Sequence, residues 1–267
     1  MAPRERILVA GATGRIGSNL VQELLSQSSH TRVRVLARNL AKARALFAQL
    51  SHASRRIEYA WGSYDDLISF AVALIDVDRL FLLTTNQTAE LEMAKIAQAA
   101  GVQHIVKVSC PEAAGHMLVE ECIVSLGVPY TFLKAQIFME SILWPSNESL
   151  RIDEACNFSI LTQEIPISAV SVKDIASCAA SILSSPIEMH KNMTHFIIGP
   201  EVLTSKQLTD KIRRTLGKSV LMDYQAEAWM GSEPQTLTMG KLESLTLTTQ
   251  ELCGRRPTSW DEFLQQR

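Results

Sequence analysis

The sequence predicts an α/β protein, with a doubly wound parallel sheet followed by a smaller C-terminal α+β lobe. In the first half of the 267-residue chain, short β-rich runs alternate with amphipathic helical stretches, as expected of right-handed βαβ units. The β-rich runs are continuously apolar, as in Ile7-Leu8-Val9, which is typical of strands buried on both faces. A cluster of glycines directly follows the first run, where we expect a tight turn into a helix.

The first half is expected to contain six strands joined by five helices. The strands are predicted at Arg6–Ala10, Arg32–Ala37, Ile57–Trp61, Arg79–Leu83, His104–Ser109 and Tyr130–Lys134. The helices are predicted at Ile16–Ser26, Leu40–Leu50, Asp65–Leu74, Ala89–Ala100 and His116–Leu126. Gly101 and Gly127 directly follow the last two helices, and glycine is common just past a helix end. Each is therefore expected to end its helix and lead into the next strand.

In the second half of the chain, the predicted strands and helices alternate less regularly. Helices are predicted at Val172–Leu183, Ser205–Leu216 and Trp260–Gln266, and strands at Thr194–Ile198 and near Val220–Tyr224. The stretch from Ala226 to the last of these helices shows little periodicity of either kind. We therefore expect a sheet-forming core over residues 1–135 and a smaller lobe over residues 136–267, with some of the later strands and helices returning to the core.

Composition argues against several classes of protein. Apolar residues make up 46% and charged residues 20% of the chain, an ordinary globular balance. The formal net charge of −2 gives no electrostatic reason to expect nucleic acid or an anionic membrane as a partner. No apolar run reaches membrane-spanning length, and the five cysteines are scattered without a CxxC pair. We expect a cytoplasmic protein with reduced thiols and no metal.

The glycine turn carries the first functional signal. Gly11, Gly14 and Gly17 follow a predicted strand and open a predicted helix, where glycines allow a tight turn and close approach of the backbone to a pyrophosphate. The helix N-terminus adds free N–H groups and a partial positive charge. This context predicts a Rossmann-type dinucleotide-binding core, the alternative being an ordinary glycine-rich βα turn. Besides the glycines, the turn would contact the cofactor through Thr13, Arg15 and Ile16.

The end of the second strand predicts which dinucleotide binds. An NAD-selective site usually carries an acid about twenty residues beyond the glycines, but here Arg38 and Asn39 follow the strand with no acid nearby. A guanidinium can grip a 2′-phosphate with two parallel hydrogen bonds, whereas a carboxylate would repel it. Arg15 and Lys42 would add charge from either side. We therefore predict NADP(H) as the cofactor, the alternative being that Arg38 is a solvated strand-end residue.

Over nearly its whole length the chain resembles NmrA-like members of the atypical short-chain dehydrogenase/reductase superfamily. The resemblance rests on the order and spacing of several motifs rather than on any one of them. They are Ile7–Gly17, Val35–Asn39, Gly62–Asp66, Arg79–Thr85, Gly101–Ser109, Gly127–Leu133, Val170–Ala176, Gly199–Thr204 and Gly254–Phe263. The short second lobe and the segment Gly-Arg-Arg-Pro-Thr-Ser-Trp are similar to NmrA-like oxidoreductases of fungal aromatic-polyketide pathways, which implies a role in secondary metabolism.

The resemblance also implies where parts of the cofactor lie. Gly62-Ser63 would lie by the adenine, and Leu83-Thr84-Thr85 would run past the ribose and pyrophosphate. Phe138-Met139-Glu140 would lie near the nicotinamide. This chain has Lys134-Ala135 where many relatives have Arg-Pro, and Ser141 where they have Asn. The resemblance therefore leaves the details of the nicotinamide pocket open.

A catalytic pair typical of the superfamily has only a false match here. Classical members use Tyr-x-x-x-Lys on a helix, and this chain contains Tyr130-x-x-x-Lys134. These residues lie in a predicted strand directly after Pro129. On a strand, residues four apart are separated by roughly 13 Å, whereas helical spacing would bring them to about 6 Å. We therefore do not interpret the pair as catalytic.

His116 is the preferred catalytic candidate. Glu120 lies four residues later on the same predicted helix, whose start is near the C-terminal ends of the strands, where ligands bind in α/β folds. A histidine can donate a proton near neutral pH, and Glu120 would orient it. The resemblance also implies a Lys or His at this point, a catalytic lysine in reductases of the isoflavone type. The alternative is a surface pair of modest structural value.

Two strand ends supply further candidates. Ser109 ends the fifth strand, where classical members place the serine that holds the substrate carbonyl; its alternative role is to cap the following turn. Lys134 ends the sixth strand and would reach cofactor or substrate, or else be solvated.

Two functions follow from these residues. The first is an NADPH-dependent oxidoreductase that passes hydride to a small apolar electrophile, such as a quinone, enone or aromatic ketone, with His116 or Lys134 supplying the proton. The second is a non-catalytic sensor that binds NADP(H) and reports to a protein partner. The lack of a credible Tyr-x-x-x-Lys pair favours the sensor, whereas the short second lobe offers little surface for a partner. Self-association stays open.

Overall fold

The computed structural model describes residues 5–27, 29–50, 55–111, 113–135, 137–143, 157–158, 168–216, 221–222 and 239–266. The chain divides into two compact units. The first unit consists of Met1–Lys134 and Ile175–His195, and the second unit of Ala135–Asp174 and Phe196–Arg267. Each unit has its own cluster of buried apolar side chains.

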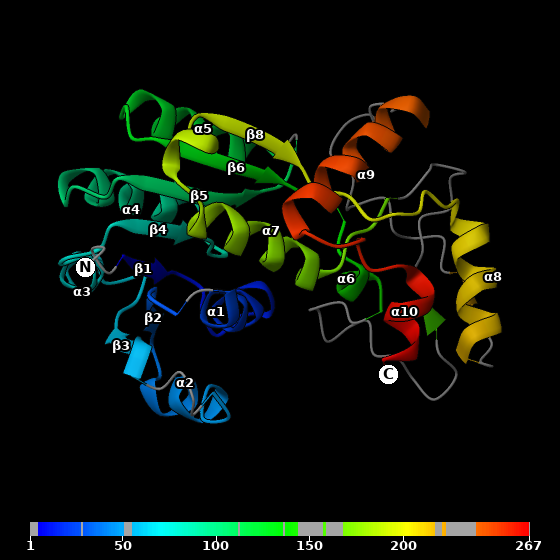
Figure 1. Ribbon diagram of the computed structural model, residues 1–267, viewed down its shortest axis with the longest axis horizontal. Helices are drawn as coiled ribbons and strands as arrows, with labels where there is room; N and C mark the ends of the chain where they lie inside the picture. Colours follow the sequence, from blue (N-terminus) through cyan, green and yellow to red (C-terminus); the bar gives the residue numbers. More distant parts are fainter. Residues whose placement is uncertain are drawn as a thin grey trace. The chain divides into compact units, whose positions relative to one another are not determined.

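A seven-stranded parallel sheet lies at the centre of the first unit (Figure 1). Its strands are β1 Arg6–Val9, β2 Arg32–Ala37, β3 Ile57–Trp61, β4 Arg79–Leu82, β5 His104–Ser109, β6 Tyr130–Lys134 and β8 Met193–Phe196, in the order β3-β2-β1-β4-β5-β6-β8. Leu8 of β1 is in register with Arg34 on one side and Leu80 on the other. The strand order reverses between β1 and β4, the point at which open α/β sheets bind ligands beyond the carboxyl ends of their strands. The predicted doubly wound parallel sheet is confirmed.

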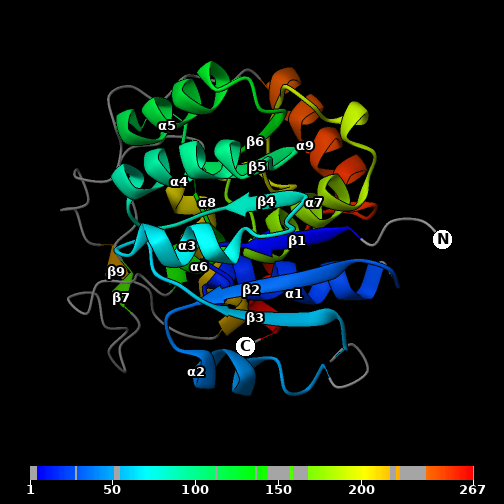
Figure 2. The ribbon, with the colours of Figure 1, turned by 90° about the vertical axis from the view of Figure 1, so that its left-hand side faces the viewer.

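Helices cover both faces of this sheet. They are α1 Arg15–Gln27, α2 Leu40–Leu46, α3 Leu67–Ala73, α4 Gln87–Ala99, α5 Ala114–Ser125 and most of α7 Val172–Ser184, with a 3-10 turn at Ile187–Met189. Figure 2 shows α3, α4 and α5 side by side in front of the sheet, with α1 and α7 behind it. The inner strands β1, β4 and β5 therefore bury both faces, which explains their largely apolar sequences.

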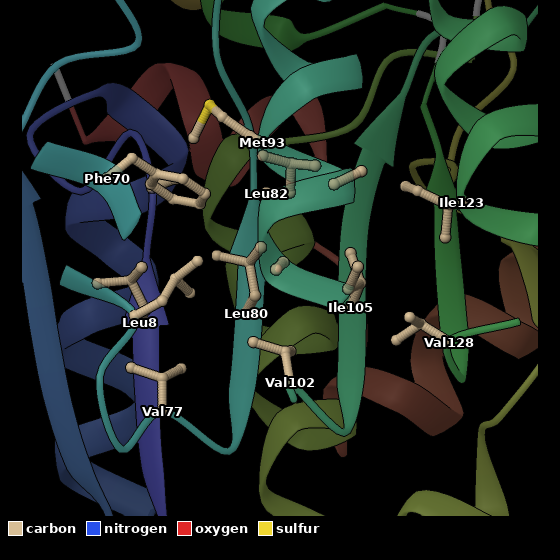
Figure 3. Packing of buried hydrophobic residues seen from close by; sticks show 14 of the residues in the cluster. Leu8, Phe70, Val77, Leu80, Leu82, Met93, Val102, Ile105, Ile123 and Val128 are labelled. Carbon is tan, nitrogen blue, oxygen red and sulfur yellow. The ribbon is translucent and has the colours of Figure 1, made fainter. Parts of the chain in front are cut away.

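The core under α3, α4 and α5 shows how the two layers join. Figure 3 shows Leu8, Leu80, Leu82 and Ile105 of the strands packed with Phe70, Met93 and Ile123 of the three helices. Gly101 and Gly127 lie just beyond α4 and α5 with φ angles of +80° and +70°, so the predicted glycine ends of these helices are confirmed. Among the residues described, no helix is long and apolar enough to cross a bilayer.

The described part of the second unit is mainly helical. It contains α6 Met139–Leu143, α8 Ser205–Leu216, α9 Met239–Cys253 and α10 Trp260–Gln265, with a short parallel pair of β7 Asn157–Phe158 and β9 Leu221–Met222. Its buried cluster includes Met139, Leu208, Ile212, Trp260 and Phe263.

Helix α9 is a correction, because no helix is predicted there from the sequence pattern. Its threonines disfavour helix by propensity and obscure the apolar periodicity. The hydroxyls of Thr248 and Thr249 nevertheless donate to carbonyl oxygens four residues earlier, at 3.2 and 3.1 Å. Such local bonds satisfy these polar groups within the helix.

Candidate cofactor and active site

The turn between β1 and α1 accepts only glycine at two positions. Gly11 has a φ of +77°, and a Cβ there would lie 2.4 Å from the carbonyl oxygen of Leu83, at the end of β4. A Cβ at Gly17 would lie 2.2 Å from the carbonyl oxygen of Gly11. The amide of Gly14 donates to that same oxygen at 2.9 Å and closes the turn. The glycines therefore bring the first turn of α1 against the ends of β1 and β4.

One side of this turn is open to solvent. Thr13, Gly14 and Arg15 are exposed, whereas Ile16 and Gly17 are buried. The first N–H groups of a helix have no partner within it, and together with the helix dipole they favour an anion. The turn thus fits a pyrophosphate, which needs close backbone approach without side chains in the way.

Arg38 lies just beyond β2, as predicted, and its side chain is exposed. Its guanidinium carbon lies 5.3 Å from the centroid of the Tyr64 ring, a cation–π contact that limits where the guanidinium can lie. Since stacking uses one face of the planar group, the N–H edge stays available to a phosphate.

Asn39 and Lys42, the other predicted contacts near β2, begin helix α2. The side chain of Asn39 accepts a hydrogen bond from the backbone N–H of Lys42 at 2.9 Å and is the N-cap of α2. Asn39 therefore has a structural role that the sequence analysis did not assign. The ammonium-bearing side chain of Lys42 is exposed at the same end of the sheet as Arg38.

The segments after β3 and β4 complete this edge of the sheet. Gly62 is buried, and a Cβ there would lie 2.6 Å from the side chain of Leu36. The Ser63 amide donates to the Ser69 hydroxyl at 3.1 Å. After β4, Thr84 donates its amide to Glu90 at 2.7 Å, and Thr85 is exposed. The segments predicted to contact adenine, ribose and pyrophosphate thus end neighbouring strands.

A buried ion pair lies behind this edge. Lys107 of β5 and Glu90 of α4 have fully buried side chains, and Lys107 Nζ lies 2.5 Å from Glu90 Oε2. The other oxygen of Glu90, Oε1, accepts the Thr84 amide. On its other side Lys107 Nζ lies 3.3 Å from Nδ1 of His116. A continuous row of polar contacts therefore joins the segment after β4 to the start of α5.

The structure corrects the expected chemistry of His116. The residue lies in the first turn of α5 and is half-buried, close to the position predicted. Burial, and then the charge of Lys107, lower the pKa of His116 to about 4, while Glu120 acts in the opposite direction. The imidazole is therefore neutral near pH 7. It cannot supply a proton as an imidazolium, but it can take part in a hydrogen bond.

Glu120, Lys134 and Ser109 surround the same region of α5, β5 and β6. Lys134 Nζ lies 3.0 Å from Glu120 Oε2, so Glu120 pairs with Lys134 instead of orienting His116 through a hydrogen bond. Ser109 is in register with Lys134 on the neighbouring strand. Its hydroxyl is buried without a hydrogen-bond partner among the described residues, so capping of the next turn is not seen there.

Tyr130 and Lys134 lie on strand β6, which confirms that they do not form a helical Tyr-x-x-x-Lys pair. The ring of Tyr130 instead stacks on Phe132, with centroids 4.4 Å apart. Tyr130 thus belongs to the apolar layer beneath α5.

Phe138 lies in the second unit and forms an isolated bridge with Val170. Its neighbour Glu140 is buried and accepts hydrogen bonds from the Ser171 hydroxyl and the Val172 amide, both at 3.1 Å. Glu140 therefore provides hydrogen-bond acceptors for polar groups at the start of α7. The position of Phe138 beside a nicotinamide stays a prediction.

Comparison with known proteins agrees with the fold. A model of the NmrA-like family matches residues 3–237. The chain belongs to the NmrA-like family. The chain is 29% identical to the (4-alkanoyl-5-oxo-2,5-dihydrofuran-3-yl)methyl phosphate reductase of Streptomyces griseus, over 93% of each chain. It is 28% identical to the NAD(P)H azoreductase of Xenophilus azovorans, over 95% of this chain and 88% of the azoreductase.

A solved structure of similar fold is the NADPH-dependent quinone oxidoreductase of Escherichia coli, complexed with NADPH. It is 23% identical, has a TM-score of 0.77, and is matched over 97% of this chain and 99% of its own. At that identity the likeness establishes the NmrA-like fold and leaves the chemistry to be argued from the site.

Glu90 and Lys107 are the site residues that the sequence analysis missed. A signal for Lys107 was present, because it is a cation within the run His-Ile-Val-Lys-Val-Ser, which was predicted to be a buried strand. A buried cation needs a partner. The partner, 17 residues earlier on α4, was not identifiable from local pattern.

Proposed function

We propose that this NmrA-like protein is an NADPH-dependent oxidoreductase that transfers hydride to a small apolar electrophile. The observation that carries the proposal is an open glycine turn at the switch point of the sheet, combined with Arg38 at the end of β2. This combination suits a dinucleotide with a 2′-phosphate. The names of the relatives support reduction, since they specify a furanone phosphate, an azo compound and a quinone.

The substrate we propose is a quinone, enone or aromatic ketone, of the kind found in secondary metabolism. The three compound classes in the relatives' names share an electron-poor conjugated double bond that can accept hydride. Substrates of this kind are flat and largely apolar, so their pocket needs apolar walls and few polar groups. Phe138, which the family resemblance implies to lie near the nicotinamide, would be one of these apolar side chains.

Several residues of the first unit would bind the cofactor. The pyrophosphate would lie on the turn Gly11–Gly17, the 2′-phosphate on Arg38 with added charge from Arg15 and Lys42, the adenine by Gly62 and Ser63, and the ribose by Leu83, Thr84 and Thr85. The reduced nicotinamide, when bound, supplies the hydride. Neutral His116 would donate a hydrogen bond to the substrate oxygen as negative charge develops there. Ser109 and Lys134 would stand nearby as further polar groups, and solvent would provide the proton.

Cofactor choice is tested by matched arginine variants. Arg38→Ala removes the predicted 2′-phosphate partner, and charge-assisted hydrogen bonds of this kind contribute roughly 1.5–3 kcal/mol, so NADPH should bind roughly 10- to 100-fold more weakly. NADH binding should hardly change. Arg44→Ala is the control, because Arg44 also stacks on a tyrosine, 4.6 Å from the Tyr59 centroid, but has no predicted contact with cofactor. Equal weakening of NADPH and NADH by Arg38→Ala would contradict the assignment.

Catalysis is tested by following NADPH consumption with a panel of quinones, enones, aromatic ketones and azo dyes. We expect turnover with at least one class, and a sharp fall in kcat in His116→Ala with NADPH affinity retained. Tight NADPH binding without consumption across the panel would instead favour the sensor.

A further inference from the structure

The ammonium group of Lys107 has three N–H donors and no acceptor. Among the described residues, three acceptors lie around it: Oε2 of Glu90 at 2.5 Å, the carbonyl oxygen of Val108 at 3.3 Å and Nδ1 of His116 at 3.3 Å. Each N–H therefore has one acceptor. Because Lys107 can only donate, Nδ1 of His116 must accept, and it cannot carry the hydrogen of the neutral ring.

Glu90 fixes Lys107 in turn. Both side chains are fully buried, so neither can exchange its partner for water. Oε2 of Glu90 balances the charge of Lys107, and Oε1 is held by the Thr84 amide at 2.7 Å. The carboxylate is thus anchored at both oxygens, and the direction of the third N–H of Lys107 toward α5 is determined.

We propose that Lys107, balanced by Glu90, is a positioning residue that holds His116 as the neutral tautomer with its hydrogen on Nε2, so that the ring presents a hydrogen-bond donor to the substrate oxygen. The tautomer follows from the contacts of the first unit alone. The role toward substrate rests on the proposed function.

This tautomer suits the proposed reduction. When bound, NADPH would supply a hydride, that is a proton and two electrons, to the substrate carbon, and the displaced π pair would move to the conjugated oxygen. A neutral Nε2–H can stabilise that anion by a hydrogen bond without transferring its proton. Solvent then supplies one proton to the oxygen, and the cofactor leaves as NADP⁺. His116 acts here as a donor of fixed direction, not as a general acid.

Among the described residues, two charged groups act on the His116 ring. They are Lys107 on β5 and Glu120 on α5, and each is held in an ion pair, with Glu90 of α4 and Lys134 of β6 respectively. Burial comes first among the causes that lower the pKa of His116 to about 4, and the charge of Lys107 second. The ring should therefore stay neutral at every pH at which a reductase is ordinarily assayed.

The test is nitrogen NMR of the histidine rings in the cofactor-free protein, which requires no turnover. In the wild type we expect the His116 ring to be neutral at pH 7 with its hydrogen on Nε2, and to titrate near pH 4. A hydrogen on Nδ1, or an imidazolium at pH 7, overturns the proposal without any variant.

A double variant then assigns the cause. Glu90→Gln/Lys107→Met replaces the buried pair by uncharged side chains of similar size, so that no charge is orphaned. We expect mixed tautomers and a titration midpoint shifted toward 6.5. The matched control is Glu120→Gln/Lys134→Met, which removes the other ion pair and should leave the tautomer unchanged. An unchanged tautomer in Glu90→Gln/Lys107→Met overturns the proposal.

Kinetics separate this inference from the proposed function. If the protein reduces a substrate, Glu90→Gln/Lys107→Met should lower kcat at least tenfold while the KM for NADPH changes less than twofold. The inflection of His116 in the pH profile of kcat should move upward from about 4 toward 6.5, because the charge of Lys107 is removed while the burial remains. An unchanged kcat and pH profile would overturn the role toward substrate. If no substrate is reduced, the proposed function fails and that role fails with it, while the NMR result still decides the tautomer.

Discussion

His104 should make the first unit less stable in mild acid. Its side chain is fully buried on β5, and Nε2 lies 2.9 Å from the hydroxyl oxygen of Thr131. That hydroxyl donates its own hydrogen to the carbonyl oxygen of His190 at 2.7 Å, so Nε2 of His104 must be the donor. The remaining nitrogen, Nδ1, is buried without a partner among the described residues. Protonating it would bury a charge with no acceptor.

The magnitude follows from the pKa values of the two states. Burial, followed by the charges of Arg79 and His190, lowers the pKa of His104 from 6.5 to about 4. The unfolded chain therefore binds more protons between these values, so the stabilising contribution is fully present above pH 6.5 and is lost as the pH falls toward 4. At 1.36 kcal/mol for each tenfold change in proton affinity, the total is about 3 kcal/mol.

The assay is urea unfolding near pH 7 and near pH 4.5, for the wild type and for His104→Gln. Glutamine can still donate to Thr131 but cannot take up a proton. Between the two pH values the wild type should lose about 2.5 kcal/mol more than the variant, because the other acid-sensitive groups are common to both and cancel in the difference. If His104→Gln loses as much stability as the wild type, the buried neutral histidine is not the cause.

Two further comparisons use matched residues. Gly11→Ala should abolish NADPH binding, because its Cβ would lie 2.4 Å from a backbone oxygen. Gly101→Ala has a similar positive φ but open space around its Cβ, so it should cost about 1 kcal/mol of stability and leave NADPH binding intact. Fluorescence titration with NADPH compares the binding of the two variants. Asp174→Asn should destabilise the second unit by at least about 2 kcal/mol, because the buried carboxylate accepts from the Thr258 amide at 2.8 Å and from its hydroxyl at 3.1 Å. Asp210→Asn, which removes only an exposed ion pair, should change urea unfolding by less than about 0.5 kcal/mol.

The strands and the glycine turn were predictable because their sequence signals are local. A strand buried on both faces is mostly apolar, and β1 and β4 are apolar at every position after the arginine that begins each of them. Gly11 has to be glycine because of a carbonyl oxygen at the end of β4, yet the pattern of glycines after a strand indicates the turn without knowledge of that contact. The sequence pattern was enough to predict the structure at positions where the backbone geometry alone determines the residue type.

The chemistry of His116 was not predictable in the same way. Its position on a helix near the strand ends followed from periodicity, but its pKa depends on burial and on Lys107, nine residues earlier on another element. Glu120 has helical spacing from His116, yet it pairs with Lys134 of β6. Spacing along a helix identifies residues that can meet, whereas the strands packed against the helix decide which of them do.

The buried pair of Lys107 and Glu90 contributes orientation rather than stability. Taking two charges out of water is costly, and buried pairs of this kind can often be replaced by apolar side chains without loss of stability. The rest of the surrounding layer is apolar, with Ile105 on the same strand and Met93 on the same helix. An apolar pair would therefore suit the packing here, but it would give no N–H to His116. The feature that the ion pair alone provides is a cation of fixed direction, 3.3 Å from Nδ1, and that contact determines which side of the imidazole is free to donate.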